Sequence, residues 1–390
     1  MSDVPQDVIK LVLYRLPPKS LLRFRSVCKA WCSLIDSKEF INEQLRQSRE
    51  SNSNRSVLLD SDELFHLRFD DKLVRLDTGN FPCEPKSVVV SCNGLVLISS
   101  AYDNIVLWNP STRKVNKLPS TPLDFPDYTV FMQVRCAFGY DSKHDDYKVI
   151  RVVQPIGESE VGSECFPCAK MYSLRSNSWK TIADFPYVLP GETNWGGYLN
   201  DTLHTFVESG NRSGSIMAFD LAKEEHYEFP KPEYNRADCC LVSVEVMQGY
   251  LTLAISRESI NSEIWVMKEY GVKESWVKLL ALVPLTSMPC QHLCPLAYSK
   301  CGDKVLLVYN GALLMWYDLK TKTRGVACLD GSPFIGDSGD DKIPTFNAVV
   351  CVGSLVSPHS PAMAEGKTGR KKISKKRDDD FLSVGFKLVL

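Results

Sequence analysis

Apolar side chains recur at helical spacing in the first 45 residues and in short alternating runs through most of the remaining chain. Val8, Val12 and Leu16 lie four residues apart, which predicts an amphipathic helix. Pro17 and Pro18 must end this helix, and Pro18 suits the first turn of the next one. The N-terminal segment therefore begins with two helices joined by a sharp break.

The second predicted helix carries Leu21 and Leu22, and a third runs from Val27 through Trp31 to Ile35. A unit of about 45 residues is too small to bury all of these side chains in a core of its own. Its surplus apolar surface therefore predicts an interface with another protein or domain.

Between residues 57 and 358 the period changes to that of short strands separated by turns, which predicts an all-β domain. A unit containing an aromatic strand, a polar turn and a closing strand recurs. Its anchor residues are spaced 64, 47, 46 and 51 residues apart and are Trp108, Tyr172, Phe219, Trp265 and Trp316. A period near 50 is typical of kelch-type propeller blades. Five blades are visible, and pairing residues 57–76 with 347–355 would close a sixth; a β-sandwich is the rival fold.

The composition fits a soluble protein, with 44% hydrophobic residues, 24% charged residues and a net charge of -1 among 390 residues. This balance argues against a surface that coats nucleic acid. No run approaches the roughly 18 apolar residues of a membrane helix, and no secretory signal begins the chain. We therefore expect a location in the cytoplasm and nucleus. The 14 cysteines, Cys92, Cys136 and Cys351 among them, are interpreted mainly as small buried hydrophobes.

The string VPQDVIKLVLYRLPPKSLLRFRSVCKAWCSLIDSKEFINEQL resembles an F-box, with more than ten positions matching in order and Phe40 in a following helix. The resemblance implies binding to a Skp-class adaptor, and through it to cullin and RING subunits of a ubiquitin ligase. The chain would then choose the protein substrate. The residues assigned to adaptor contact are Pro5, Val8, Ile9, Val12, Leu13, Leu16, Pro17, Leu21, Leu22, Val27, Cys28 and Trp31.

The β region resembles the plant F-box-associated domain through SCNGLVLI, LWNPSTRKVNKLP, GYDSKHDDYKVIRVV, YSLRSNSWKTI and WVMKEYGVKESWVKL. The final residues, KKRDDDFLSVGFKLVL, further resemble plant F-box proteins that restrain immunity by promoting turnover of nucleotide-binding leucine-rich-repeat (NLR) receptors. Pollen S-locus F-box proteins, which recognise secreted ribonucleases, share the same architecture. Substrate choice lies in loops on a shared fold, so architecture alone does not separate these alternatives.

Candidate catalytic and metal-binding groups are sparse. Cys165 and Cys168 have the spacing of a metal knuckle, and residues 290–294 hold a Cys, His, Cys cluster, but loop thiols are the favoured interpretation. His144 lies beside two aspartates in the turn of a strand pair, which favours a solvated turn over acid/base chemistry. No Gly-rich phosphate loop or partnered nucleophile is evident. The sequence predicts a non-enzymatic protein with no cofactor and no metal.

Substrate contacts are expected in loops at one mouth of the propeller, at residues 119–130, 155–168, 186–196 and 231–238. Aromatic and arginine side chains are frequent interface anchors, although some could belong to the blade cores. The candidates are Tyr128, Phe166, Tyr187, Trp195, Tyr234 and Arg236.

The predicted division is an F-box at 1–45, a linker at 46–56, a propeller at 57–358 and a tail at 359–390. The tail carries a dense basic run over residues 367–377, which suits nuclear import, contact with an acidic partner or a solvated tail. Its last ten residues are apolar and are predicted to dock on the propeller or on a partner. The alternative function is a non-ligase interaction protein or a propeller enzyme with a vestigial F-box.

Overall fold

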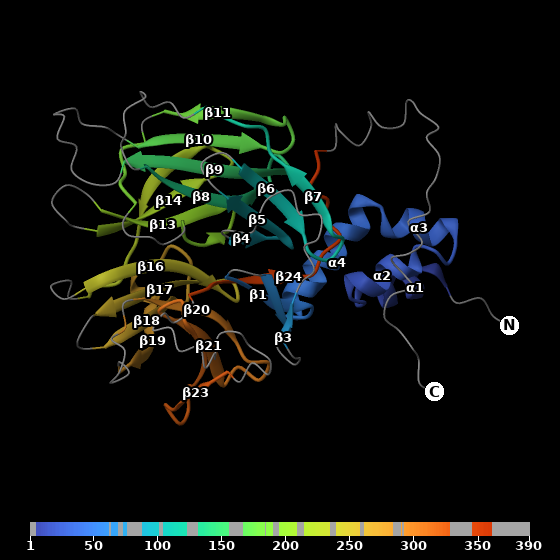
Figure 1. Cartoon of the computed structure of the whole chain (residues 1–390). Helices are drawn as coiled ribbons and strands as arrows, with labels where there is room; N and C mark the ends of the chain where they lie inside the picture. Colours follow the sequence, from blue (N-terminus) through green and yellow to red (C-terminus); the bar gives the residue numbers. More distant parts are fainter. Residues whose placement is uncertain are drawn as a thin grey trace, which may run out of the picture.

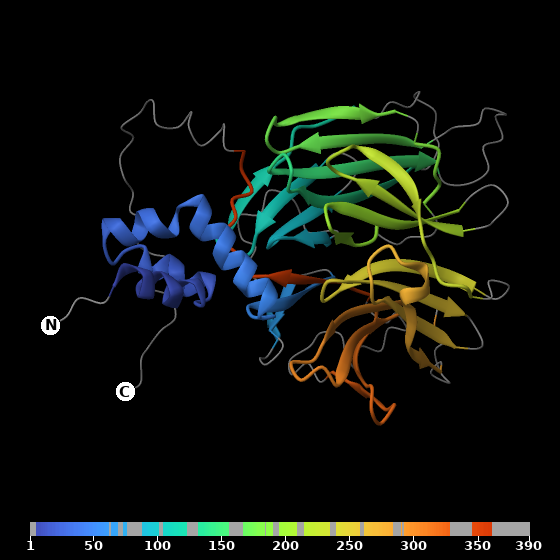
Figure 2. The same cartoon turned by 180° about the vertical axis from the view of Figure 1, so that it is seen from behind.

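The computed structural model describes residues 5–61, 64–68, 73–75, 88–100, 104–122, 132–155, 167–183, 185–189, 195–208, 214–234, 239–257, 261–283, 290, 292–327 and 345–360. A small helical unit stands at one side of a ring of sheets, as Figures 1 and 2 show from opposite sides. No described helix is long and apolar enough to cross a membrane. The basic run and the apolar end of the tail lie outside the described residues.

The helical unit comprises α1 (Gln6–Tyr14), α2 (Pro18–Phe24), α3 (Lys29–Ile35) and α4 (Lys38–Glu50). Pro17 has an extended backbone and Pro18 opens α2, so the two prolines separate α1 from α2 as predicted. Ser37 caps α4 by accepting a hydrogen bond from the backbone N–H of Phe40 at 3.2 Å.

Helix α4 corrects the expectation of a linker at residues 46–56. The helix continues through Glu50, and strand β1 begins at Arg55. The segment is polar, but Leu45 and Ser48 are buried on one face of the helix, against the rest of the molecule. Packing of that face therefore decides the structure, rather than the polar composition that suggested a linker.

The described strands form six antiparallel sheets of four strands each, which confirms the predicted six-bladed propeller. Blade 1 contains β24 (Asn347–Val352), β1 (Arg55–Asp60), β2 (Leu64–Arg68) and β3 (Leu73–Arg75). Blade 2 contains β4 (Val88–Cys92), β5 (Leu95–Ser100), β6 (Asn104–Asn109) and β7 (Lys114–Lys117). Blade 3 contains β8 (Met132–Asp141), β9 (Asp146–Pro155), β10 (Cys168–Ser173) and β11 (Ser178–Ile182).

Blade 4 contains β12 (Tyr198–Leu199), β13 (Thr202–Glu208), β14 (Gly214–Asp220) and β15 (Glu225–Phe229). Blade 5 contains β16 (Cys239–Met247), β17 (Tyr250–Arg257), β18 (Ser262–Met267) and β19 (Trp276–Leu282), with the short helix η1 (Lys273–Ser275) before its last strand. Blade 6 contains β20 (Leu293–Tyr298), β21 (Lys304–Tyr309), β22 (Leu313–Asp318) and β23 (Arg324–Val326).

The ring closes where the two ends of the β region meet in blade 1. Strand β24 pairs antiparallel with β1, from Arg55 opposite Val352 to Asp60 opposite Asn347. This pairing joins segments almost 300 residues apart and covers sheet edges that would otherwise stay open. It is the closure that the sequence predicted.

The hydrophobic core consists of layers between neighbouring blades. Tyr172 and Phe219 are fully buried and Trp108 nearly so, whereas Trp265 and Trp316 are half-buried. The repeated aromatic positions therefore hold adjacent blades together. Cys92, Cys136 and Cys351 lie in these layers as buried free thiols.

A turn in blade 2 fixes the chain segment that follows β24. Gly94 has φ of +80°, and a Cβ there would collide with the backbone of Val352 and the side chain of Ser354. Glycine therefore allows this segment to lie directly against the β4–β5 turn. The Asn109 side chain, fully buried, donates to the carbonyls of Ser354 at 3.1 Å and Val356 at 2.7 Å. These contacts hold the segment beside the helical unit.

Candidate functional sites on the helical unit and in the propeller cavity

The helical unit has a small core that it shares with the propeller. Leu13, Leu21, Ile35 and Phe40 are buried together, and Leu355 from the segment after β24 packs among them. Ring contacts extend this core, with Tyr14 and Phe40 centroids 4.8 Å apart. The unit therefore depends partly on the propeller to bury its apolar side chains.

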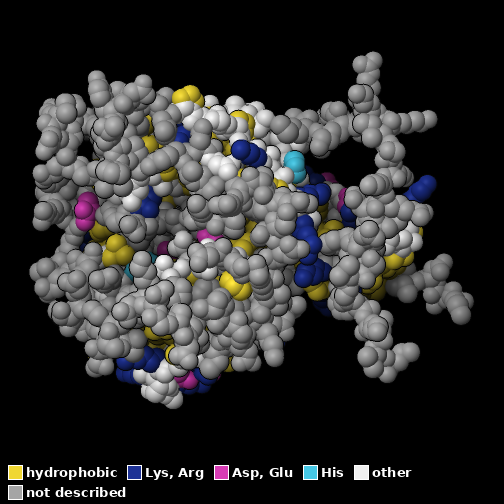
Figure 3. All heavy atoms as spheres, viewed as in Figure 1, with side chains coloured by type: hydrophobic (Ala, Val, Ile, Leu, Met, Phe, Trp, Pro, Cys, Tyr) yellow, Lys and Arg dark blue, Asp and Glu magenta, His cyan; other side chains and the backbone are white. Residues whose placement is uncertain are grey.

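A set of apolar residues remains exposed on the same helices. Val8, Leu11 and Val12 on α1 are 45%, 54% and 56% exposed, and Val27 after α2 is 59% exposed. Figure 3 shows hydrophobic side chains at the surface of the helical unit. We call these four residues the apolar surface. Exposed aliphatic side chains at successive helical positions are typical of a protein-binding face.

The residues predicted for adaptor contact divide into three groups. The exposed ones are Pro5, Val8, Val12, Pro17, Val27 and Cys28, and the half-buried ones are Ile9, Leu16, Leu22 and Trp31. Leu13 and Leu21 are instead 1% and 0% exposed, so they build the core of the unit and are unavailable to a partner. Leu11 was not predicted, although it lies three residues after Val8 and belongs to the same helical face.

Contacts between α4 and the propeller fix the position of the apolar surface. Lys38 forms an ion pair with Asp145 in the β8–β9 turn, and the Tyr140 hydroxyl donates to the same carboxylate at 2.6 Å. Gly353 N–H donates to the Asn54 carbonyl at 2.8 Å. The helical unit and the propeller therefore meet through side-chain, backbone and apolar contacts rather than through a free linker.

The substrate-binding residues predicted on the propeller differ in how exposed they are. Tyr187 and Tyr234 are half-buried, and Tyr187 packs edge-on against Phe185 at 5.6 Å. Trp195 is only 2% exposed and lies in the core with Phe185, which fits the alternative of a blade-core residue, and it also borders the cavity at the centre of the ring. Tyr128, Phe166 and Arg236 lie outside the described residues. Trp195 is buried because the adjoining Gly196 packs tightly against blade 5, bringing the loop into the core.

The turn at residues 144–146 is structural. His144 Nδ1 lies 2.7 Å from Asp141, and Asp146 accepts hydrogen bonds from Ser173 Oγ at 2.5 Å and Arg175 N–H at 2.8 Å. With Asp145 paired to Lys38, all these carboxylates have partners that hold turns together.

The suggested metal ligands do not form a site within the described part of the chain. Cys290 is fully buried, His292 and Cys294 are half-buried, and no group of three potential ligands converges there. Burial lowers the pKa of His292 and raises that of Cys294, which disfavours the thiolate that a zinc site requires. Cys165 lies outside the described residues.

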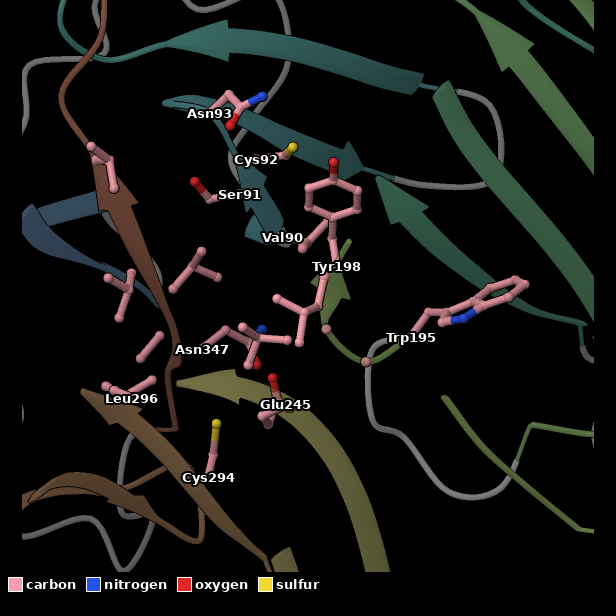
Figure 4. A pocket seen from close by; sticks show the side chains of 18 of the residues that line it. Val90, Ser91, Cys92, Asn93, Trp195, Tyr198, Glu245, Cys294, Leu296 and Asn347 are labelled. Carbon is pink, nitrogen blue, oxygen red and sulfur yellow. The ribbon is translucent and has the colours of Figure 1, made fainter. Parts of the chain in front are cut away.

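A cavity of about 1900 Å³ passes between the blades at the centre of the ring. Val90 and Cys92 of β4, Tyr198 of β12, Glu245 of β16 and Cys294 of β20 line it, and α4 residues line the end nearest the helical unit. Figure 4 shows the Glu245 carboxyl and the Cys294 thiol pointing into this space. We call it the central cavity.

Glu245 is a described acid whose carboxyl pKa is raised, whereas the pKa values of acids such as Asp141 and Glu263 are lowered. Burial raises the pKa of its carboxyl to about 7, and the same carboxyl helps to raise the pKa of Cys294. Among the described residues no side chain donates a hydrogen bond to it. The sequence contains a signal for this residue, because Glu245 is the one charged residue at the end of strand β16, which reads VSVEVM.

Comparison with known proteins gives two family matches that together span most of the chain. The model of the F-box domain matches residues 1–43, and that of the F-box associated beta propeller domain matches residues 53–356. F-box protein CPR1 of Arabidopsis thaliana is 32% identical, with all of both chains covered. F-box protein At4g22390 of the same organism is 31% identical, again over the whole of both chains.

Solved structures give a weaker likeness. An oligogalacturonate lyase in complex with manganese is 13% identical, with a TM-score of 0.42, covering 76% of this chain and 79% of that one. A likeness at this level carries no argument about activity.

Proposed function

The chain belongs to the F-box proteins that carry an F-box associated propeller domain, and we propose that it is the substrate-recognition subunit of an SCF (Skp, cullin, F-box) ubiquitin ligase. In this role the helical unit binds a Skp-class adaptor, which connects it to cullin and RING subunits. The propeller binds the protein to be ubiquitinated. The chain contributes proximity and orientation, while another subunit carries out the chemistry, so we propose no catalytic activity of its own.

The observation that carries this proposal is the division of the helical unit into a core and an apolar surface. Leu13 and Leu21 are buried in the core of the helical unit, whereas Val8, Val12 and Val27 remain exposed. Leaving such side chains in water is costly, at roughly 25 cal/mol per Å² of apolar surface. A partner that covers them would recover that free energy.

The contacts of α4 support the same role. Because Lys38 and the segment around Leu355 tie the helical unit to the propeller, a substrate on the propeller is held in a defined direction from the adaptor. Such positioning is what transfer to a substrate lysine requires.

For the target we propose an NLR immune receptor, which would make the protein a negative regulator of plant defence. The whole-chain likeness to CPR1 and the resemblance of residues 375–390 to immunity-restraining F-box proteins support this choice. An S-locus-type protein that recognises ribonucleases is the alternative. We propose the cytoplasm and nucleus as its location, on the basis of the basic run in the tail.

The test compares plant cells expressing the wild type with cells expressing the double variant Val8→Glu, Val12→Glu. Both positions are exposed, so the fold is expected to persist, while the adaptor interface gains two charges. Proteins that the propeller binds should accumulate with the variant and still co-purify with it. Val277→Glu, at an exposed position on the propeller, is the matched control. Unchanged target turnover with the double variant would favour a non-ligase interaction protein.

A further inference from the structure

Glu245 occupies an unusual position within the central cavity. It lies on β16 opposite Thr252 of β17, which is fully buried, and its carboxyl points into the open space between the blades. Leu296 and Val90 line this space beside polar residues such as Asn347, and burial of the carboxyl raises its pKa. A carboxylate in such surroundings is costly unless it is paired.

The other acids that line the central cavity already have partners. Glu50 pairs with Arg46 at 2.6 Å, and Asp201 accepts hydrogen bonds from Ser142 and from the Tyr198 hydroxyl. Asp60 is also engaged elsewhere. Glu245 therefore differs from these acids, because no described lysine or arginine forms an ion pair with it.

A second unsatisfied polar group lies beside Glu245. Ser243 is two residues earlier on β16, so its side chain shares the same face of the strand. It is 5% exposed, and its Oγ has no hydrogen-bond partner among the described residues. Buried polar atoms are nearly always hydrogen-bonded in folded proteins. Ser243 does not line the central cavity, so Glu245 is the group that a ligand in the cavity would meet.

We propose that the central cavity binds a positively charged ammonium or guanidinium group against Glu245. The cation would provide the missing counter-charge, and apolar lining residues such as Leu296 would contact its hydrocarbon stem. The group can be carried by a lysine or arginine side chain of a bound protein or by a free organic amine.

The thiol of Cys294 allows the proposal to be tested without knowing the natural ligand. The full-length protein is treated at about pH 8 with a cationic aminoethyl or an anionic sulfonatoethyl methanethiosulfonate, and labelling is followed residue by residue by mass spectrometry. The thiolate forms a disulfide with the reagent and releases methanesulfinate. The ratio of the cationic to the anionic rate reports the local potential, because the thiolate fraction cancels.

Glu245→Gln keeps the side-chain volume but removes the charge, and we expect it to lower this ratio at Cys294 about tenfold. The ratio at the exposed Cys28 should not change, and Glu274→Gln, an equal charge change outside the cavity, should have no effect at either thiol. An unchanged ratio at Cys294 would overturn the proposal. If burial prevents any labelling of Cys294, thermal unfolding in about 10 mM N-acetyl-arginine methylamide replaces it, and an equal shift of the melting temperature for the wild type and Glu245→Gln would overturn the proposal. The wild-type measurement stands even if the variant misfolds.

Competition then distinguishes the two sources of the cation. N-acetyl-arginine methylamide at about 10 mM should slow labelling of Cys294 if the cavity accepts a protein side chain, and spermidine should do so if it accepts a free polyamine. N-acetyl-citrulline methylamide, an uncharged isostere of the arginine compound, should not protect. Protection by neither cation would contradict a binding site. The cation site is independent of adaptor capture, so either claim can fail alone.

Discussion

Replacing Glu245 with glutamine should stabilise the protein above neutral pH. The folded protein raises the pKa of this carboxyl from 4.5 to about 7, because the cavity removes much of its hydration. Folding therefore favours the protonated form, and the stability that it contributes is complete below about pH 4.5 and is lost as pH rises towards 7. Glutamine resembles the protonated acid at every pH.

The size of the effect follows from the displacement of that pKa. One pH unit corresponds to 1.36 kcal/mol, so the ionised carboxylate costs at most about 3 kcal/mol of folding free energy above pH 7. The free energies of unfolding of the variant and the wild type should thus differ by up to about 3 kcal/mol at pH 8. They should be nearly equal at pH 4, where both side chains are neutral.

Urea unfolding at these two pH values measures the difference, with Glu274→Gln as the control for loss of an exposed negative charge. Other titrating groups are common to the wild type and the variant, so they cancel in the comparison. A variant that is less stable than the wild type at pH 8 would refute the reasoning. It would show that the carboxylate already has a favourable partner in the folded protein.

Two further substitutions test the packing and the ion pairs of the propeller. Lys148→Met should lower the free energy of unfolding by about 3 kcal/mol in urea titration, because it leaves the fully buried carboxylate of Asp141 without the lysine that lies 2.8 Å away. The exposed Lys223→Met should change the free energy of unfolding by less than about 1 kcal/mol. Equal losses for the two variants would contradict a stabilising role of the buried Lys148–Asp141 pair. Gly214→Ala should lower the melting temperature and reduce the free energy of unfolding by about 1–3 kcal/mol, because the added Cβ would collide with the ring of Phe206. An unchanged melting temperature would show that the ring can move aside.

The sequence predicted the propeller well because the residues that define each blade lie close together in the chain. Aromatic residues such as Tyr172 and Phe219 recur once per blade, and each sits at the layer between neighbouring blades. Closure through β24 was also predictable, since an unpaired strand edge at each end of the β region needs a partner.

Which residues of the helical unit are buried was harder to predict, because apolar residues occur on most sides of its helices. Periodicity places Val12 and Leu13 on a helix but does not say which of them faces inwards, and only the packing of Leu355 and α4 decides it. The polar composition of residues 46–50 concealed the end of α4, whose buried face depends on tertiary contacts.

The central cavity could not be derived from the sequence because it arises where six blades meet. Glu245 is visible as a charge in an apolar strand, but its lack of a partner depends on side chains from other blades. The burial of Trp195 was hidden for the same reason, since a loop position in the sequence became part of a core.

The most direct test of the central claim is the affinity of the full-length protein for a purified Skp-class adaptor, measured by titration calorimetry. We expect Val12→Glu to weaken binding about 30-fold or more, because it places a charge in the apolar surface, while Val277→Glu on the propeller leaves the affinity unchanged. Equal affinities for the wild type and Val12→Glu, with both proteins folded, would contradict the assignment of this surface to the adaptor.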